Sequence, residues 1–217
     1  MNDFSLGTAA LDIRPLLNQH RSIQRGDAGP STGRGWCLQT LRGRLVEISS
    51  AGTTPSLSAA AALLYEAQRR AEPAAWVTAW DATFFPPDLA DSGIDLEALP
   101  VIRATAIQAG ARAADELLRS GAFGLVVLDL GARANVPMPM QARFSGLVKK
   151  HQATLLFLTR KPCDAGSLGS LISLRCDGVV WRSSFNRFAW ELHVLKDKCR
   201  GPGWRYAEVC HGPDGLC

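Results

Sequence analysis

From residue 44 onward, stretches with the apolar pattern of a strand are followed by stretches with the apolar pattern of a helix. Short apolar runs typical of strands cover residues 44–49, 75–80, 124–130 and 153–159. Patterns typical of helices lie between them, at residues 55–70, 105–119 and about 140–150. The run GLVVLDL at 124–130 is apolar at nearly every position, as in a strand buried on both faces of a parallel sheet. This order predicts an α/β fold with a mostly parallel central sheet flanked by helices.

The last part of the chain has a different pattern. Residues 178–182, 187–197 and 204–209 have the composition of strands and leave no room for helices between them. Strands joined by such short connections pair in antiparallel fashion. We therefore expect antiparallel strands at the edge of the sheet at its C-terminal end.

The first residues do not fit the core pattern. Residues 21–35 are rich in Arg, Gly, Ser and Pro, which indicates a linker or a disordered loop. The apolar segment 9–17 is interrupted by Pro15 and is too short to fold alone, so we expect it to dock on the core or on another molecule. The chain therefore divides into an N-terminal arm and flexible linker, 1–34, and one core domain, 35–217.

Composition excludes several classes of protein. Apolar residues make up 47% of the 217, but no apolar run approaches the ~20 residues of a membrane helix. The N-terminus has an acidic residue where a signal peptide carries positive charge. The six cysteines lack the paired spacing of a zinc site, and we expect free thiols. These features predict a cytoplasmic protein with no membrane segment and no metal.

Charge is unevenly distributed along the chain. Residues 141–217 carry 12 Lys and Arg against 6 Asp and Glu, whereas residues 1–140 carry 12 against 14. A basic C-terminal third is compatible with a nucleic-acid or acidic-protein partner. The alternative is that these charges only form a solvated face.

The stretch GRLVEISSAGTTPSLS, residues 43–58, has the strand–turn–helix order of a phosphate-binding loop. Such a loop requires two glycines, a lysine and a serine or threonine. The four positions hold, in order, Ser50, Pro55, Ser56 and Leu57. No Lys or Arg lies between Arg44 and Arg69, and proline lacks the N–H that an anion would use at the helix start. We therefore expect a degenerate P-loop and no nucleotide cofactor.

Several segments resemble the RecA recombinase family, in the family's order, from residue 43 to residue 208. GRLVEI resembles its first core strand, YEAQRR the end of its phosphate-loop helix, and SGIDLEAL the segment after its second strand. AFGLVVLDL resembles the Walker B strand, and QARFSGLVKKHQATLLFLTR the next helix and strand. LHVLKDK resembles the late strand with its Lys-x-Lys signature. The resemblance implies a RecA-like core.

The resemblance also assigns roles to single residues. Asp129 falls on the Walker B aspartate and Asp81 on the catalytic glutamate, but without a phosphate cradle we interpret both as polar residues at strand ends, bound by neighbouring amides. Arg160 replaces the glutamine that senses the γ-phosphate in the family. We therefore expect no catalytic residue in this chain.

Basic residues are the candidates for contacts with partners. Lys196 and Lys198 match the family's pair that reaches across a subunit interface toward a neighbour's nucleotide. Here they are interpreted as contacts to protein or DNA, or as lysines that only guard a sheet edge. Arg133, Arg160 and Lys161 lie in or beside the two short segments that match the family's DNA-binding loops, and they would support weak, salt-sensitive DNA binding.

A RecA-like core with a broken P-loop and reduced loops resembles ImuA of the bacterial ImuA–ImuB translesion module. This implies a non-enzymatic accessory protein of the SOS response that binds an ImuB-type polymerase subunit, RecA or both, and that could inhibit recombination. Two alternatives remain. One is a cell-division inhibitor similar to SulA, which is also a nucleotide-free RecA-like fold, and the other is a residual ATPase that uses Asp81 and Asp129.

Overall fold

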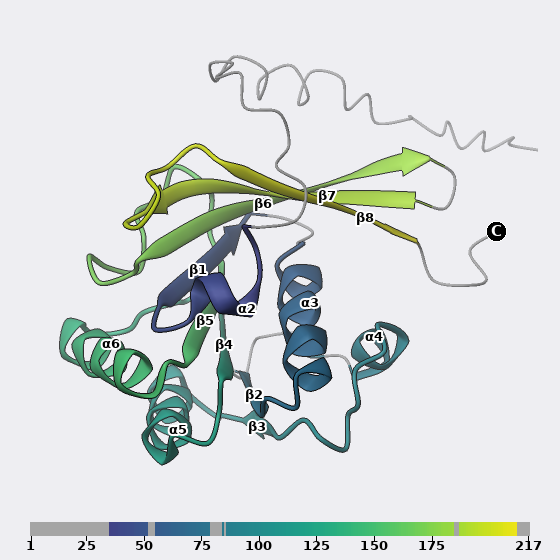
Figure 1. Ribbon diagram of the computed structural model, residues 1–217. Coiled ribbons are helices and arrows are strands. Elements are labelled where there is room, and N and C mark those ends of the chain that lie inside the picture. Colours follow the sequence, from purple (N-terminus) through teal and green to yellow (C-terminus); the bar gives the residue numbers. More distant parts are fainter. Residues whose placement is uncertain (1–34, 52–54, 79–83, 85, 185–186, 212–217) are drawn as a thin grey trace, which may run out of the picture.

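The computed structural model describes residues 35–51, 55–78, 84, 86–184 and 187–211 (Figure 1). The expected N-terminal arm, 1–34, lies outside the described residues, and so does Asp81. Among the described residues, no helix combines the length and the apolar character needed to cross a membrane.

One eight-stranded sheet forms the centre of the molecule. Its strands are β1 (Leu45–Ser50), β2 (Ala74–Thr78), β3 (Val101–Arg103), β4 (Leu125–Gly131), β5 (Thr154–Arg160), β6 (Leu174–Ser184), β7 (Arg187–Asp197) and β8 (Arg205–His211). They are arranged in the order β3-β2-β4-β5-β1-β6-β7-β8. Neighbours from β3 to β6 are parallel, and β6–β7 and β7–β8 are antiparallel. The predicted α/β class, the mostly parallel sheet and the antiparallel C-terminal strands are confirmed.

Strand β6 differs from the prediction in one respect. It begins at Leu174, and its first residues pair in parallel with β1, where Val46 lies opposite Leu174 and Ser49 opposite Asp177. On its other side β6 pairs with β7 in antiparallel fashion along its whole length, from Leu174 opposite Asp197 to Ser184 opposite Arg187 (Figure 1). Thus β6 is an interior strand that joins the parallel and antiparallel parts of the sheet. The prediction began this strand at residue 178 and omitted LRCD at 174–177, although its alternation of apolar and charged residues is typical of a strand.

Helices cover both faces of the sheet. They are α2 (Leu38–Leu41), α3 (Pro55–Arg69), α4 (Pro86–Asp91), α5 (Ile107–Ser120) and α6 (Met138–His151). Figure 1 shows α3 on one side of the sheet and α5 and α6 on the other. The three long helices are confirmed within a few residues of their predicted ends. The short elements α2, α4 and β3 were not predicted, because three to six residues show too little periodicity.

Two apolar cores form, one on each face. On the α3 side, Ile48, Leu64 and Trp76 are buried together, and on the α5–α6 side Leu128 and Phe144 are buried with their neighbours. Strands β4 and β5 contribute alternate residues to both cores. This explains why both strands are almost continuously apolar in the sequence.

Strand β1 is apolar on one face and mixed on the other. Val46 and Ile48 belong to the α3-side core, whereas Leu45 belongs to the opposite core. Because side chains alternate along a strand, Glu47 and Ser49 lie on the same face as Leu45. The connection between β5 and β6, residues 161–173, crosses this face, and its Ser173 N–H donates to the Leu45 carbonyl. We call this connection the 161–173 segment.

Candidate functional site

The start of α3 is closed by packing. Pro55, the first residue of α3, is buried, and Gly178 on β6 lies directly behind it. A Cβ placed on Gly178 would lie 2.6 Å from Pro55 Cγ, so the proline ring already fills that space. The helix therefore begins against β6, at the position where a phosphate-binding loop would open toward its ligand.

The other described positions that the sequence analysis compared with a phosphate-binding loop are also enclosed. Ser50, at the end of β1, is 2% exposed, and Ser56 in the first turn of α3 is 6% exposed. Leu57 is partly buried and packs against the α3-side core. Residues 52–54 lie outside the described residues. The described part of this junction presents packed apolar and small side chains.

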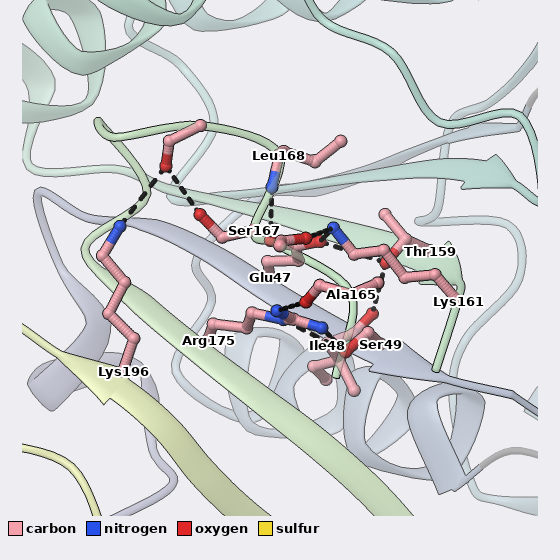
Figure 2. A network of polar contacts seen from close by, with 12 residues as sticks. Glu47, Ile48, Ser49, Thr159, Lys161, Ala165, Ser167, Leu168, Arg175 and Lys196 are labelled. Atoms are coloured by element: carbon pink, nitrogen blue, oxygen red, sulfur yellow. Dashed lines mark hydrogen bonds and ion pairs between the residues drawn. The ribbon is translucent and has the colours of Figure 1, made fainter. Parts of the chain in front are cut away.

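A buried carboxylate organises the neighbouring region. Glu47 has no exposed surface, and its carboxylate receives three donors (Figure 2). Thr159 Oγ1 donates to Oε1 at 3.2 Å, the Leu168 backbone N–H donates to Oε2 at 2.9 Å, and Lys161 Nζ lies 2.5 Å from Oε1. One side chain of β1 thus joins the end of β5 to two points of the 161–173 segment.

A buried guanidinium completes this network. Arg175 on β6 is 5% exposed, and its Nε and Nη2 donate to Ser49 Oγ at 3.3 and 3.2 Å. The other donors of Arg175 reach backbone carbonyls of the segment, at Ala165 (Figure 2) and at Pro162. Charged donors that bind carbonyl oxygens in a buried site hold a loop more strongly than neutral donors do. Glu47 and Arg175 therefore fix the segment from the sheet beneath it.

Gln141 connects the loop between β4 and α6 to the 161–173 segment. Its Nε2 donates to the Val136 carbonyl at 2.7 Å and to the Leu168 carbonyl at 2.9 Å. Val136 lies in the connection between β4 and α6, and Leu168 lies in the 161–173 segment. Gln141 is 2% exposed, so the bridge is shielded from water. Both loops are held against the core.

The predicted contact lysines lie at the same segment. Lys161 points inward, where its ammonium contacts Glu47 and donates to the Gly166 carbonyl at 2.6 Å. Lys198 Nζ donates to the Ser170 carbonyl at 2.5 Å. Lys196 Nζ donates to the same oxygen at 3.4 Å and to the Gly169 carbonyl at 3.3 Å. Burial lowers the pKa of Lys196, and the nearby Lys198 ammonium lowers it further.

The remaining predicted residues are not brought into one site. Asp129, near the end of β4, is 7% exposed, and its Oδ1 accepts from the Gly131 N–H at 3.2 Å. This contact agrees with its interpretation as a strand-end carboxylate bound by an amide. Arg133 and Arg160 are exposed at the ends of β4 and β5. The second carboxylate, Asp81, lies outside the described residues.

A second buried ion pair holds the other end of the segment. Arg44, just before β1, contacts Asp197 at 2.6 Å and donates to the Ser173 side chain and carbonyl, both at 3.1 Å. Trp204 Nε1 and the Cys199 N–H also donate to Asp197. Burial alone would raise the pKa of Asp197, but these hydrogen bonds and the Arg44 charge together lower it.

Cysteines and possible metal ligands are further candidates for chemistry in the described residues. Cys37, Cys163, Cys176 and Cys199 are free thiols. The described part of the chain contains no group of His, Cys, Asp and Glu side chains that could hold a metal ion.

Glu47, Arg175 and Gln141 were not predicted from the sequence. Glu47 had one available signal, since it is the one charged residue in the β1 sequence LVEISS. Arg175 and Gln141 had none, because their partners lie in a connection whose path depends on the strand order.

Comparison with known proteins does not assign this site. No family model matches the chain, and a search of curated proteins finds no significant match.

Proposed function

We propose that this chain is a non-catalytic RecA-like accessory protein that acts through protein contacts in SOS-linked, error-prone translesion synthesis. The observation that carries the proposal is the closed start of α3, where Pro55 packs against Gly178. A strand and helix in the order used for phosphate binding are retained, but the helix start is buried and has no cation in the surrounding sequence. The role requires a cytoplasmic chain and no nucleotide.

The arrangement of the sheet supports the RecA-like part of the proposal. β1 lies inside the sheet between β5 and β6, and α3 follows it, while the antiparallel strands come last. This agrees with the order of the segments that resemble the RecA family. A fold can host many functions, so the choice among them depends on the residues.

The held loops favour protein partners over single-stranded DNA. Gln141 ties the β4–α6 connection to the 161–173 segment, and Glu47 and Arg175 hold that segment against the sheet. Loops fixed in this way leave little chain to wrap around a nucleic acid. We propose RecA and an ImuB-type polymerase subunit as partners. A bound RecA-like chain without a nucleotide site would cap one end of a RecA filament.

Affinity capture and strand exchange test this function. The tagged full chain is incubated with purified RecA and with the ImuB-type subunit, with and without single-stranded DNA, and is then added in excess to RecA strand exchange. We expect retention of at least one partner and slower strand exchange. If neither partner is retained and filament assembly is unchanged, the proposal fails.

Two further measurements separate the alternatives. Calorimetric titration of Mg–ATP into the chain, alone and with RecA, would show saturable heat if the chain were a residual ATPase. Overexpression would give filamentous cells, together with binding to FtsZ, if the chain acted as a cell-division inhibitor. The proposed function predicts neither result.

A further inference from the structure

An exposed surface with an apolar half and a basic half lies beside the held segment. It is formed by Pro137, Met138, Pro139, Ser170, Lys196 and Lys198, and we call it the Met138–Lys198 surface. Met138 is 48% exposed, the largest value among the exposed large apolar side chains of the described residues. Ser170 joins the two halves, since its Oγ lies 4.0 Å from Met138 Sδ and its carbonyl accepts from both lysines.

The basic half has charge that the described residues do not neutralise. Lys196 and Lys198 direct their ammonium groups at one carbonyl oxygen, that of Ser170, so two like charges lie close together. Among the described residues, neither lysine forms an ion pair; Glu47, the carboxylate that attracts Lys196, is already in contact with Lys161. An ammonium has three donors, and the Ser170 carbonyl uses one from Lys198. A carboxylate of a binding partner would accept hydrogen bonds from the remaining N–H groups of the two lysines and reduce the repulsion between their charges.

The apolar half favours a protein segment over a nucleic acid. Met138 is flanked by two exposed prolines, Pro137 and Pro139. Flexible, polarisable methionine side chains are common at surfaces that accept varied apolar partners. Proline has no N–H, so this turn offers fewer backbone donors to a phosphate than other helix starts do.

We propose that the Met138–Lys198 surface docks an acidic segment of a partner protein. A carboxylate of that segment binds Lys196 and Lys198, and a neighbouring apolar side chain packs on Met138. This inference depends on the proposed function only in that the chain acts through protein contacts.

Fluorescence anisotropy with the full chain tests the docking surface. The probe is a short labelled peptide that alternates glutamate and leucine, and the comparison probes are a lysine–leucine peptide and a short single strand of deoxythymidine. The variant Lys198→Gln removes one charge but keeps a donor for the Ser170 carbonyl. Met138→Ser removes the apolar contact. Lys150→Gln is the matched control, because Lys150 is an exposed lysine in the last turn of α6, the helix that begins at Met138.

We expect the acidic peptide to bind, and Lys198→Gln to weaken it about threefold, as for a partly exposed ion pair. Met138→Ser should weaken it about tenfold, as for a buried interface side chain. Lys150→Gln should have no effect. The proposal is overturned if the acidic peptide does not bind, if Lys150→Gln weakens binding as much as Lys198→Gln, or if the oligonucleotide binds more tightly than the peptide.

The same variants separate this inference from the proposed function. If RecA or the ImuB-type subunit is captured equally well by Lys198→Gln, Met138→Ser and the unmodified chain, the docking surface is wrong and the proposed function stands. If neither protein is captured but the acidic peptide binds with the expected variant pattern, the surface stands and the proposed partners are wrong.

Discussion

The start of α3 and the 161–173 segment follow two strands that end side by side, with Ser50 of β1 opposite Arg160 of β5. Parallel α/β sheets bind their ligands at this edge. In both regions described residues of the chain cover this edge, but different interactions hold them in place. Pro55 closes the first by packing against Gly178, whereas Glu47 and Arg175 hold the second through ion pairs and hydrogen bonds.

The two regions should differ in how easily a binding partner can open them. Apolar packing has no donors or acceptors to exchange, so opening the α3 start would expose apolar surface to water. Polar contacts at the 161–173 segment can be replaced by water or by groups of a partner at smaller net cost. We therefore expect the α3 junction to be a permanent structural element, and the segment to be the more responsive of the two.

The largest expected effect is that of Glu47→Ala. The substitution leaves the Lys161 ammonium without its carboxylate and the Leu168 N–H without an acceptor. Loss of one partner from a buried ion pair should lower the free energy of unfolding by about 3 kcal/mol. Urea unfolding followed by circular dichroism measures this change, and limited proteolysis should show faster cleavage within 161–173.

Glu72→Ala is the matched control for Glu47→Ala. Glu72 pairs with Arg42 at 2.9 Å, but the Arg42 side chain is 41% exposed, whereas Glu47 is fully buried. We expect a loss of about 0.5 kcal/mol for such a surface pair. Equal losses for the two variants would contradict the role of Glu47 as the anchor of the segment.

Asp197→Asn tests the anchor at the other end of the segment. The variant keeps a similar shape but weakens the bonds to Arg44, Cys199 and Trp204, and should cost about 2 kcal/mol at pH 7. Because the pKa of Asp197 is lowered in the folded state, its contribution is complete above the unfolded value of about 4 and is lost as the pH falls below it.

Urea midpoints at pH 7, 4 and 3 therefore should show the Asp197→Asn variant approaching the unmodified chain as the solution becomes more acidic. A constant difference between the two proteins over this pH range would show that the carboxylate charge of Asp197 does not stabilise the fold.

Gly178→Ala tests the apolar closure. The added methyl group would meet the Pro55 ring, and overpacking of this kind should cost about 1.5 kcal/mol. Gly146→Ala is the control, because a Cβ at Gly146, in the middle of α6, has no neighbour within 4 Å. It should stabilise the protein by about 0.5 kcal/mol through helix propensity. If Gly178→Ala is neutral in urea unfolding, the start of α3 is not packed as described.

The smallest expected effect is a difference in thiol labelling, which compares the exposure of cysteines in and around the 161–173 segment. Cys163, in the 161–173 segment, and Cys199 are exposed, whereas Cys176 on β6 is buried. Burial, and secondarily the Asp197 charge, raise the pKa of the Cys176 thiol, so it stays protonated at neutral pH. Brief treatment with N-ethylmaleimide and peptide mapping should label Cys163 and Cys199 but not Cys176. Equal labelling of Cys176, which belongs to the α3-side core, would indicate that this core opens readily.

Local sequence was sufficient for the main elements of the fold. The long helices and the buried strands were predicted because their periodicity extends over several turns or alternations. The absence of a cation between Arg44 and Arg69 was also visible in the sequence, and so was the proline at the start of α3. These features concern neighbouring residues, whose geometry the local backbone sets.

The contacts of the candidate site depend on distant residues. Leu168 lies 121 positions from Glu47, and Ser49 lies 126 positions from Arg175, which reaches it because β6 pairs with β1. Nothing in the local pattern of the 161–173 segment indicates that it crosses the polar face of β1. Lys196 and Lys198 were selected as candidates from the sequence, but their convergence on Ser170 follows from the pairing of β6 with β7.

The order of residues along the chain was thus sufficient to predict the main secondary structure and the fold class, because periodicity is a local property. It also showed that residues 45–68 lack the lysine that a phosphate-binding loop requires. The closure of the α3 start, the buried anchors of the 161–173 segment and the Met138–Lys198 surface follow from the strand order. It brings together groups that are distant in the sequence, such as Glu47 and Leu168, which are 121 positions apart. The physical reason is that burial and ion pairing depend on neighbours in space.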